Sequence, residues 1–361
     1  MIGKPTLFRL HRYFGLAAAA FLLVQALTGL VLVFGPQFAQ LVDPVGMTSR
    51  AGPGDASPAR LLAAAEARYP TYRIDRLVYP EQADGTYLVH LDDGHAGKRY
   101  VSLDRHDATI RREGSIWRFP VIAAFNIHDQ WLSGIPGMML VSITGMALLG
   151  LAGTGLAFWW PKRGRFAKSL AVQWHLKPRL VLRQLHRTAG AVISLLLVMM
   201  AVTGLFIAIP MVLDGPEARW FTPAPFAPRI EPALAVARTR YPDHALRDVR
   251  MQGPTRIAFF FHAPERNSRA VHRIVVDTSG PRVAAELGAF ENNAAWVFTL
   301  PLHSGTIFGL AGRLIILLAG IALALLAATG PLMWYQARRA KRRPARAAAP
   351  TAPPGNAKTP A

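Results

Sequence analysis

The chain contains no cysteine among its 361 residues. This absence excludes disulfide bonds, thiolate metal sites, iron–sulfur clusters and covalent attachment of c-type haem through a Cys-x-x-Cys-His motif. Acidic residues are also missing from three stretches, which are residues 1–12, residues 161–187 and the tail from residue 336. All 21 acidic residues therefore lie between these stretches, although the whole chain has a formal charge of +20.

Long apolar runs are abundant, and 52% of the residues are hydrophobic. Four windows are each long enough to cross a bilayer, which takes roughly 20 apolar residues. Arg313 is the only charged residue inside them. The windows are residues 13–34, 136–160, 188–209 and 308–334. The sequence therefore predicts a mainly α-helical membrane protein with four transmembrane helices.

The basic residues predict the orientation of these helices. The three acid-free stretches carry three, eight and seven Lys or Arg residues. The positive-inside rule places such stretches in the cytoplasm, so we expect both termini and the middle loop there. The positive charge then faces the lipid headgroups, and no nucleic-acid partner is needed to explain it. The basic tail, residues 336–361, is rich in Pro and Ala and is expected to be disordered.

The chain contains an internal repeat with an offset of 175 residues. Within the predicted spans and their flanks, this offset maps His, Gly, Thr-Gly and Trp positions onto identical residues. The matches include His11 with His186, His128 with His303, Thr28-Gly29 with Thr203-Gly204, Thr154-Gly155 with Thr329-Gly330, Gly15 with Gly190, Gly137 with Gly312, Gly145 with Gly320, and Trp159 with Trp334.

The two long intervening segments repeat more loosely, since "EARYP" at 66–70 corresponds to "RTRYP" at 238–242. Each segment predicts a small α+β module with one helix followed by strands. The expected helices are 58–68 and 231–240, and the expected strands are 72–79, 86–91, 98–103, 246–251, 256–262 and 271–277. One repeat is then span, module, span, and the two copies are related by an axis along the membrane normal.

This organisation divides the chain into alternating membrane and aqueous segments. The predicted boundaries are 1–12 (cytoplasmic), 13–34 (first span), 35–127 (first periplasmic module), 128–160 (histidine segment and second span), 161–187 (cytoplasmic loop), 188–209 (third span), 210–302 (second periplasmic module), 303–335 (histidine segment and fourth span) and 336–361 (cytoplasmic tail).

Four duplicated histidines flank the spans. His11 and His186 lie at the cytoplasmic ends of two spans, and His128 and His303 lie at the opposite ends of the other two. A span of 22 residues rises about 33 Å, so His11 cannot share a ligand with His128. Each histidine can instead share a ligand with its symmetry mate, which lies at the same depth in the membrane. The sequence therefore predicts two sites, one near each face, each built by both repeats.

The glycines beside these histidines leave two interpretations open. At 100° per residue, Gly15 and Gly29 fall on the His11 face of the first helix, and Gly190 and Gly204 repeat this relative to His186. A histidine on a face without neighbouring bulk suits a flat macrocycle. Small residues also simply allow helices to pack closely.

Paired imidazoles without thiols indicate two b-type haems, each held by two histidines. Histidines at a membrane interface and a zinc site are the alternatives; no carboxylate accompanies the histidines at zinc-site spacing. Arg12 and Arg187, with Arg9, are candidates to pair with the haem propionates at the cytoplasmic side, and Arg313 at the other side. Headgroup contact explains the same arginines. Asp129 is a candidate to orient His128.

Other histidines carry weaker signals. His90, His95 and His106 with Asp92 and Asp93 suggest a metal site, but the surface of a hairpin explains them better. His175 in the middle loop has no symmetry mate and is interpreted as interfacial.

The two "LHR-x-x-G" motifs, the single histidines before the second and fourth spans and the two "R-Y-P" modules resemble the PepSY-associated transmembrane helix family. The resemblance covers about residues 5–337. It implies an iron-regulated inner-membrane protein of the ferric-siderophore reductase (ferrioxamine-reductase) type, with two b haems ligated by His11 with His186 and His128 with His303. The middle loop is too short for a flavin or nicotinamide domain.

We therefore expect a transmembrane electron-transfer protein that reduces a ferric siderophore or another ferric chelate in the periplasm. Its electrons would come from a quinol or a cytoplasmic reductase. One alternative is a non-redox membrane protein whose PepSY modules bind or regulate a periplasmic partner. A chelate transporter is a third possibility, disfavoured by four spans without a broken polar helix.

Overall fold

The computed structural model describes residues 3–95, 97–214 and 225–342. Four helices are long and apolar enough to cross a membrane, as predicted. They are α1 (Lys4–Val33), α6 (Ile135–Trp159), α8 (Pro178–Asp214) and α11 (Gly309–Arg342). Their best windows have mean hydropathies between 1.9 and 2.8. Most of their apolar surface faces outward, as expected for helices that contact lipid.

The long helices extend beyond the predicted spans. α1 begins at Lys4 and α8 at Pro178, so His11 and His186 lie about two turns inside their helices. Proline is favoured in the first helical turn because its missing N–H has no partner there anyway. α11 continues through residues 336–342, which were expected to be disordered; the remaining tail, residues 343–361, lies outside the described residues.

Each repeat has a helical break between its second histidine and its second span. α5 (Pro120–Gln130) ends before a left-handed turn at Trp131 and Leu132, and α10 (Ala295–His303) is followed by a short 3₁₀ turn, η2 (Thr306–Phe308). A Cβ atom on Gly137 would overlap the carbonyl oxygen of Gln130, and one on Gly312 would overlap that of Gly305. Glycine at these duplicated positions lets the chain fold back closely.

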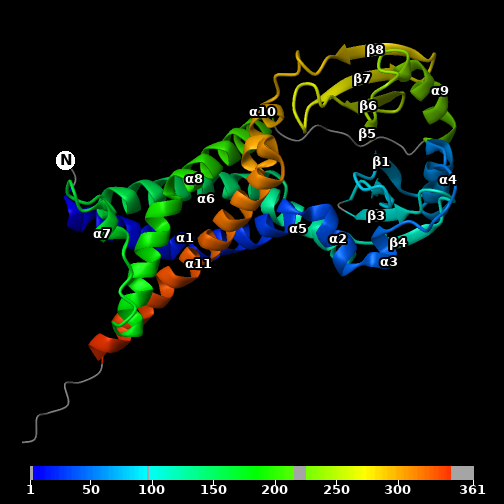
Figure 1. Ribbon diagram of the computed structural model, residues 1–361. Coiled ribbons are helices and arrows are strands. Elements are labelled where there is room, and N and C mark those ends of the chain that lie inside the picture. Colours follow the sequence, from blue (N-terminus) through cyan, green and yellow to red (C-terminus); the bar gives the residue numbers. More distant parts are fainter. Residues whose placement is uncertain (1–2, 96, 215–224, 343–361) are drawn as a thin grey trace, which may run out of the picture.

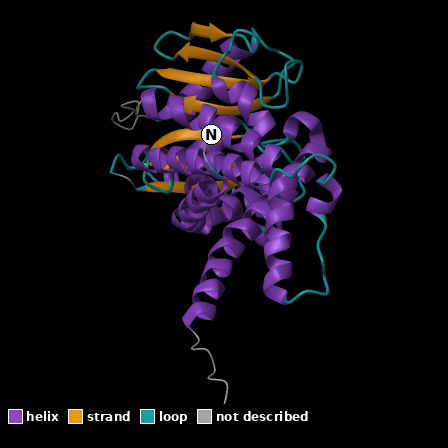
Figure 2. Cartoon of the chain, turned by 90° about the vertical axis from the view of Figure 1, so that its left-hand side faces the viewer, coloured by secondary structure: helices purple, strands orange, loops and turns teal. Residues whose placement is uncertain are grey.

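The two repeats interlock in the helical bundle. α6 packs mainly on α8, and α1 packs mainly on α11, so the largest helix–helix contacts join one repeat to the other. A Cβ on Gly320 would lie 2.8 Å from Leu30 Cδ2, and the equivalent Gly145 faces Leu205 at 3.2 Å. Figure 2 shows the end of α11 and the start of α8 projecting beyond the other helices.

The two α+β modules lie together at one end of the bundle (Figure 1). Their helices are α4 (Pro58–Arg68), with Ser57 as its N-cap, and α9 (Ala227–Arg238). The six predicted strands are confirmed, and each module adds a fourth strand at its edge. The strands are β1 (Arg73–Val78), β2 (Tyr87–Asp92), β3 (Lys98–Leu103), β4 (Ile110–Gly114), β5 (Leu246–Met251), β6 (Arg256–His262), β7 (Val271–Asp277) and β8 (Arg282–Leu287).

Short helices connect the modules to the bundle. They are α2 (Gly35–Val42), α3 (Pro44–Met47) and η1 (Ile116–Arg118) in the first repeat, and α7 (Phe166–Leu170) lies between the repeats. Asp43 caps α3 by accepting a hydrogen bond from the Gly46 N–H at 3.0 Å.

The two modules share one continuous antiparallel sheet of eight strands in the order β4-β3-β2-β1-β5-β6-β7-β8. They join through β1 and β5, where Leu77 pairs with Val249. The offset of 172 residues between the modules relates these two residues, so they mark the pseudo-twofold axis. One sheet face carries the main hydrophobic core, including Leu77, Val249, Phe259 and Phe261, and packs on α4 and α9. The other face is directed toward α5 and α10 (Figure 1).

A buried carboxylate binds three arginines at this junction. Asp248 is fully buried, and its oxygens lie 2.9 Å from Arg76, 2.8 Å from Arg247 and 2.6 Å from Arg250. Burial alone would raise the pKa of Asp248, but the three guanidinium groups hold it well below the ordinary value. Arg76 and Asp248 occupy equivalent positions in the two modules, so a cation and an anion meet across the axis.

Gly320→Val should destabilise the bundle by about 1–3 kcal/mol, because the added side chain must displace Leu30 between α1 and α11. Thermal unfolding of the detergent-solubilised protein measures this. Gly153→Val is the matched control, since a Cβ there meets no atom within 4 Å. Equal melting temperatures for the two variants would contradict the packing described here.

Asp248→Asn should loosen the module junction by about 3 kcal/mol, because it leaves three arginines without their carboxylate. A carboxylate with a lowered pKa stabilises the fold above its unfolded-state pKa and loses this effect as the pH falls. The difference between wild type and variant should therefore be full at pH 7 and shrink below about pH 4. Hydrogen exchange of the β1 and β5 amides measures it. A difference independent of pH would argue against the charge interaction.

Candidate functional site

The structure brings the four duplicated histidines together as two pairs, one at each end of the bundle. The ring centroids of His11 and His186 lie 6.5 Å apart, and those of His128 and His303 lie 6.3 Å apart. We call His11 and His186 the far pair, because they lie at the end away from the sheet. His128 and His303, on α5 and α10, form the sheet-side pair.

Each histidine faces a threonine of a transmembrane helix through its Nδ1 atom. In the far pair, His11 Nδ1 lies 3.3 Å from Thr154 Oγ1, and His186 Nδ1 lies 2.8 Å from Thr329 Oγ1. His11 Nδ1 also lies 3.1 Å from the Leu151 carbonyl oxygen. These threonines belong to the duplicated Thr-Gly motifs of α6 and α11.

The sheet-side pair repeats the arrangement with the other two Thr-Gly motifs. His128 Nδ1 lies 3.1 Å from Thr28 Oγ1 on α1, and His303 Nδ1 lies 3.0 Å from Thr203 Oγ1 on α8. His128 Nδ1 is also 3.0 Å from the Gln25 carbonyl oxygen. All four histidines therefore have the same kind of partner.

The threonine hydroxyls determine which imidazole nitrogen carries the proton. Each hydroxyl donates to the carbonyl four residues earlier in its own helix, at distances of 2.6–2.8 Å. The oxygen then serves the histidine as an acceptor, so Nδ1 must carry the hydrogen and donate it. In a neutral imidazole this leaves Nε2 unprotonated, with its lone pair available to a metal.

The glycine after three of the four threonines makes room for the ring. Cβ atoms on Gly29 and Gly155 would lie 3.1 Å from the Cε1 atoms of His128 and His11, and one on Gly204 would lie 3.3 Å from His303. Gly15 and Gly190 instead face Leu151 and Leu326, at 3.5 and 3.8 Å. Of the glycines predicted to share the His11 face, Gly29 thus contacts the histidine at the opposite end of the bundle.

Both repeats contribute to both pairs. Within a repeat, the first transmembrane helix supplies a far histidine and the Thr-Gly motif for a sheet-side histidine, and the second supplies the Thr-Gly motif for the far one. His11 and Thr28, both on α1, are separated by about 25 Å along the helix. The two pairs are thus separate sites, as predicted from their depths.

The ring separations match a single metal ion held by both histidines. Metal–imidazole bonds of about 2.0 Å, made through Nε2, place two ring centroids on opposite sides of the metal about 6.4 Å apart. The observed values of 6.5 and 6.3 Å lie on either side of this distance. Metal-ligating histidines also donate their second N–H to an acceptor, as these four do.

Comparison with known families supports the architecture. The sequence matches the family described as the PepSY-associated TM region over residues 8–337, which is most of the chain. The chain belongs to the PepSY-associated TM region family. A search of curated proteins found no match. The protein is therefore a multi-pass membrane protein in which four transmembrane helices accompany two PepSY-like modules.

In this family member the two duplicated arginines next to the far pair are partly engaged. Arg12 donates to the Tyr13 hydroxyl at 2.9 Å, and Arg187 donates to the Ala171 carbonyl at 3.2 Å. The Nε atoms of both arginines are buried and have no hydrogen-bond partner among the described residues. The guanidinium groups of Arg12 and Arg187, which the duplication relates, thus each keep one unpaired N–H donor beside a histidine of the far pair.

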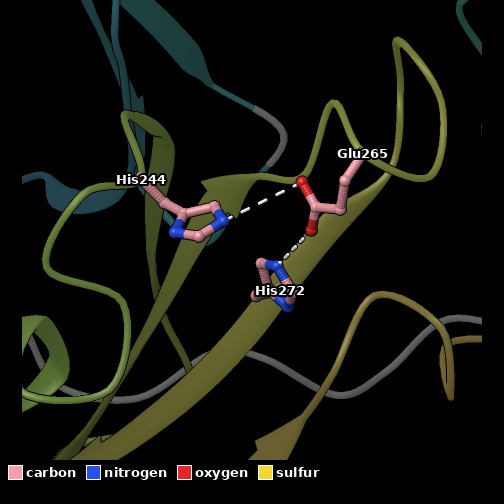
Figure 3. Close-up of side chains that lie close together, drawn as sticks. All are labelled: His244, Glu265 and His272. Atoms are coloured by element: carbon pink, nitrogen blue, oxygen red, sulfur yellow. Dashed lines mark hydrogen bonds and ion pairs between the residues drawn. The ribbon is translucent and has the colours of Figure 1, made fainter.

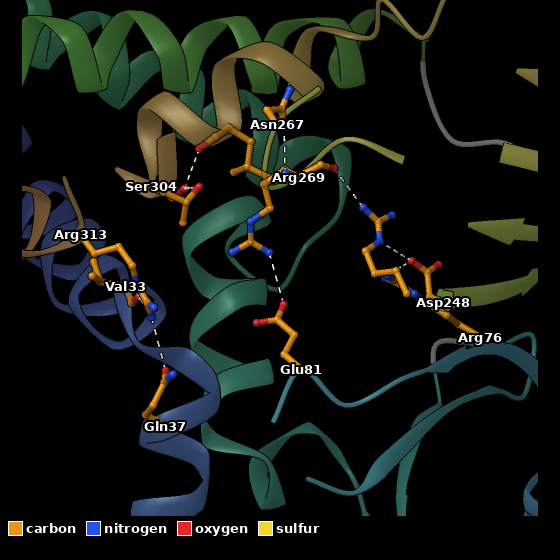
Figure 4. A network of polar contacts seen from close by, with 12 residues as sticks. Val33, Gln37, Arg76, Glu81, Asp248, Asn267, Arg269, Ser304 and Arg313 are labelled. Atoms are coloured by element: carbon orange, nitrogen blue, oxygen red, sulfur yellow. Dashed lines mark hydrogen bonds and ion pairs between the residues drawn. The ribbon is translucent and has the colours of Figure 1, made fainter. Parts of the chain in front are cut away.

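Arg313, predicted to lie beside the sheet-side pair as a partner for an anion, has another role. Its guanidinium donates to the Val33 carbonyl at 2.7 and 3.0 Å and lies 4.1 Å from the centre of the Phe34 ring (Figure 4). It thereby caps the carbonyl end of α1 from α11. Asp129 is likewise not the partner of His128 Nδ1, because Thr28 and Gln25 occupy that position.

A different histidine group in the second PepSY-like module was not predicted from the sequence. His244, Glu265 and His272 place one ligand atom each within 4.8 Å of one another (Figure 3). His272 Nδ1 accepts the Ala289 N–H at 3.1 Å, so its Nε2 carries the proton and donates to Glu265 at 2.8 Å. That nitrogen has no lone pair to offer a metal, and His244 Nε2 lies 3.8 Å from the other oxygen of Glu265.

The other histidines do not form a site. His90 packs against Tyr100, with ring centroids 4.9 Å apart, and His106 contacts the Gly54 carbonyl. Among the described residues, the group around Glu265 is the only one with three metal-ligating side chains in reach of one ion. The metal site considered for His90, His95 and His106 is therefore not formed. His175 is exposed.

Replacing Thr329 by Val should change the tautomer of His186, because Thr329 supplies the acceptor for its Nδ1 proton. We expect the ¹⁵N spectrum of histidine-labelled protein to show His186 as the Nδ1–H form in the wild type, and a mixture in the variant. Thr144→Val is the matched control, since Thr144 lies inside the transmembrane helix α6 but bonds only to backbone carbonyls. An unchanged His186 signal in Thr329→Val would contradict the assignment.

Proposed function

We propose that the protein is a membrane electron-transfer protein that holds two b-type haems and reduces a ferric chelate on the side of the membrane where the PepSY-like modules lie. His11 and His186 would hold one haem, and His128 and His303 the other. The proposal follows from one repeated observation: four imidazoles, paired at 6.3–6.5 Å, each with a threonine acceptor at Nδ1.

The number of ligands favours haem over a bare metal ion. Each pair offers two nitrogens, and no third histidine or carboxylate joins either pair among the described residues. Structural zinc needs four protein ligands and catalytic zinc three. A haem iron already has four ligands from its porphyrin, so two histidines complete its coordination. The chain has no cysteine, so the porphyrin would be bound without a covalent link.

Charge near the far pair supports the same proposal. A haem carries two propionates, which arginine binds well. The unpartnered Nε atoms of Arg12 and Arg187 lie one residue after His11 and His186, on opposite sides of the pseudo-twofold axis. At the sheet-side pair, Arg313 is engaged with α1, so we do not assign it to a propionate.

The two histidine pairs would each hold one haem, which would supply one-electron transfer between ferric and ferrous iron. Ligation by both histidines of a pair would disfavour oxygen binding. The chain's own residues orient the imidazoles and leave Nε2 available to a metal, because each threonine oxygen accepts a hydrogen bond from Nδ1–H. Transfer of one electron to a ferric chelate gives a ferrous chelate, whose hard oxygen ligands bind the iron less strongly.

The electron donor would be a quinol or a separate reductase. The segment between α6 and α8 is short and contains only the small helix α7, with no nucleotide-binding module. The basic residues around the far pair favour a cytoplasmic location for that end and for both termini, by the positive-inside rule. The PepSY-like modules would then be periplasmic and the membrane the bacterial inner membrane.

Purified wild-type protein should show a b-type haem signal in its reduced-minus-oxidised spectrum, with two haems per chain. His11→Ala and His186→Ala should each lose the same haem, because each removes one of two ligands to one iron. His128→Ala and His303→Ala should each lose the other. Pyridine haemochrome assays and the spectra of single variants measure the loss, and transfer to a ferric chelate should fall to background in all four.

His175→Ala is the control, because His175 is an exposed histidine in the segment between α6 and α8. It should retain both haems. Colourless wild-type protein, indifferent to all five substitutions, would refute the proposal in favour of a non-redox protein whose modules bind a partner. Loss of the same haem from His11→Ala and His128→Ala would refute the assignment of pairs.

A further inference from the structure

The sheet face directed toward α5 and α10 carries more positive charge than its own carboxylates neutralise. At the module junction, Arg76, Arg247 and Arg250 all bind the single carboxylate of Asp248. One carboxylate thus pairs with three guanidinium groups, which leaves an excess of two positive charges. We call Arg76, Arg247 and Arg250 the junction arginines.

The junction arginines are held in place but remain partly accessible. Their side chains are 29%, 16% and 31% exposed, whereas that of Asp248 is 0% exposed. The guanidinium of Arg250 lies 4.4 Å from the centre of the Phe260 ring. The buried Nε atom of Arg76 has no hydrogen-bond partner among the described residues. Asp248 therefore uses only part of the donor capacity of this cluster.

Further charges on the same face do not restore the balance. Arg273 lies opposite Phe260 in the β6–β7 register and therefore faces the same side as Arg250. Arg269 pairs with Glu81 at 3.6 Å, which neutralises that arginine only. The pKa of the nearby His90 also responds to this excess positive charge. Burial, and then the charge of Arg76, lower its pKa to about 3, so it stays neutral at physiological pH.

This face also leads to the sheet-side histidines. The guanidinium of Arg247 lies 5.6 Å from the centre of the Trp296 ring, in the first turn of α10. His303 is at the other end of α10, about 10 Å further along the helix axis. Figure 4 shows Arg76 and Asp248 on the side of the sheet that faces α10. An anion bound to the junction arginines would lie between the sheet and the helix that carries His303.

We propose that the junction arginines are the docking site for the ferric chelate, and that this chelate is anionic, with catecholate or carboxylate ligands. Guanidinium groups bind such oxygen ligands through paired hydrogen bonds, and a chelate with surplus negative charge complements the uncompensated arginines. The inference rests on the proposed function, which identifies the ligand as an electron acceptor. The inference narrows the proposed function, because it excludes neutral and cationic hydroxamate chelates as preferred substrates.

Binding of redox-inert gallium chelates tests this without any electron transfer. The full-length protein is placed in nanodiscs of zwitterionic lipid and titrated calorimetrically with gallium tris-catecholate, of charge −3, and neutral gallium tris-acetohydroxamate. The anionic chelate should bind at least about tenfold more tightly, since several charge-assisted hydrogen bonds depend on its charge. Equal affinities would overturn the proposal.

Arg250→Gln should weaken the anionic chelate about tenfold and leave the neutral one unchanged, whereas Arg250→Lys, which keeps the charge, should recover most of the affinity. Arg282→Gln, at an exposed position on the edge strand β8, is the control and should bind like wild type. Thermal unfolding of each variant checks that the fold is retained. Normal binding by a folded Arg250→Gln variant would overturn the proposal.

Two further measurements distinguish chelate docking from membrane binding and from a failure of the electron-transfer function. Co-sedimentation with phosphatidylglycerol vesicles that depends on Arg250, without chelate binding, would assign the arginines to a membrane surface and overturn the inference. The haem spectrum is recorded on the same samples. Arginine-dependent binding by protein without haem would refute the electron-transfer function alone. Intact haem with no chelate preference would refute the docking site alone.

Discussion

An imidazole placed in an apolar helical bundle must find a partner for its N–H group, because neither lipid nor hydrocarbon side chains can accept the proton. In this protein a threonine of a neighbouring helix meets that need at all four paired histidines. The threonine keeps its own hydrogen bond in this arrangement, because its hydroxyl proton is donated to a backbone carbonyl of its own helix. At three of these four histidines the adjacent glycine allows the ring to come close. Each histidine therefore ties two helical segments together, and its tautomer follows from that contact.

The duplication turns this local contact into two symmetric sites. Each repeat makes one half of the far pair and one half of the sheet-side pair, and the halves meet across the pseudo-twofold axis. The strong packing of α6 on α8 and of α1 on α11 has the same origin, because both contacts join one repeat to the other. Neither repeat alone contains a complete pair of facing imidazoles. The geometry thus depends on the assembly of both halves at once.

Much of this arrangement could be predicted from the sequence, and the limits have physical reasons. Apolar run length and strand alternation predicted the spans and six strands, and the offset of 175 residues predicted which histidines meet. The edge strands β4 and β8 were missed because neither carries an alternating pattern; β8 is mostly exposed and β4 is mostly half-buried. The partner of Arg313 was missed because Val33 offers only a backbone carbonyl, 280 positions away. The threonines were visible as repeated residues, but a hydroxyl does not reveal its partner on another helix.

The continuous sheet has a consequence for how the two modules diverged. Arg76 and Asp248 stand at corresponding places on either side of the axis, beside the paired Leu77 and Val249. A self-associating ancestor with a single module would have set two identical side chains against each other there, either two cations or two anions. Once both modules were encoded by one gene, the two positions could change independently. Opposite charges at this point require two modules of different sequence, and they would discourage either module from pairing with a copy of itself.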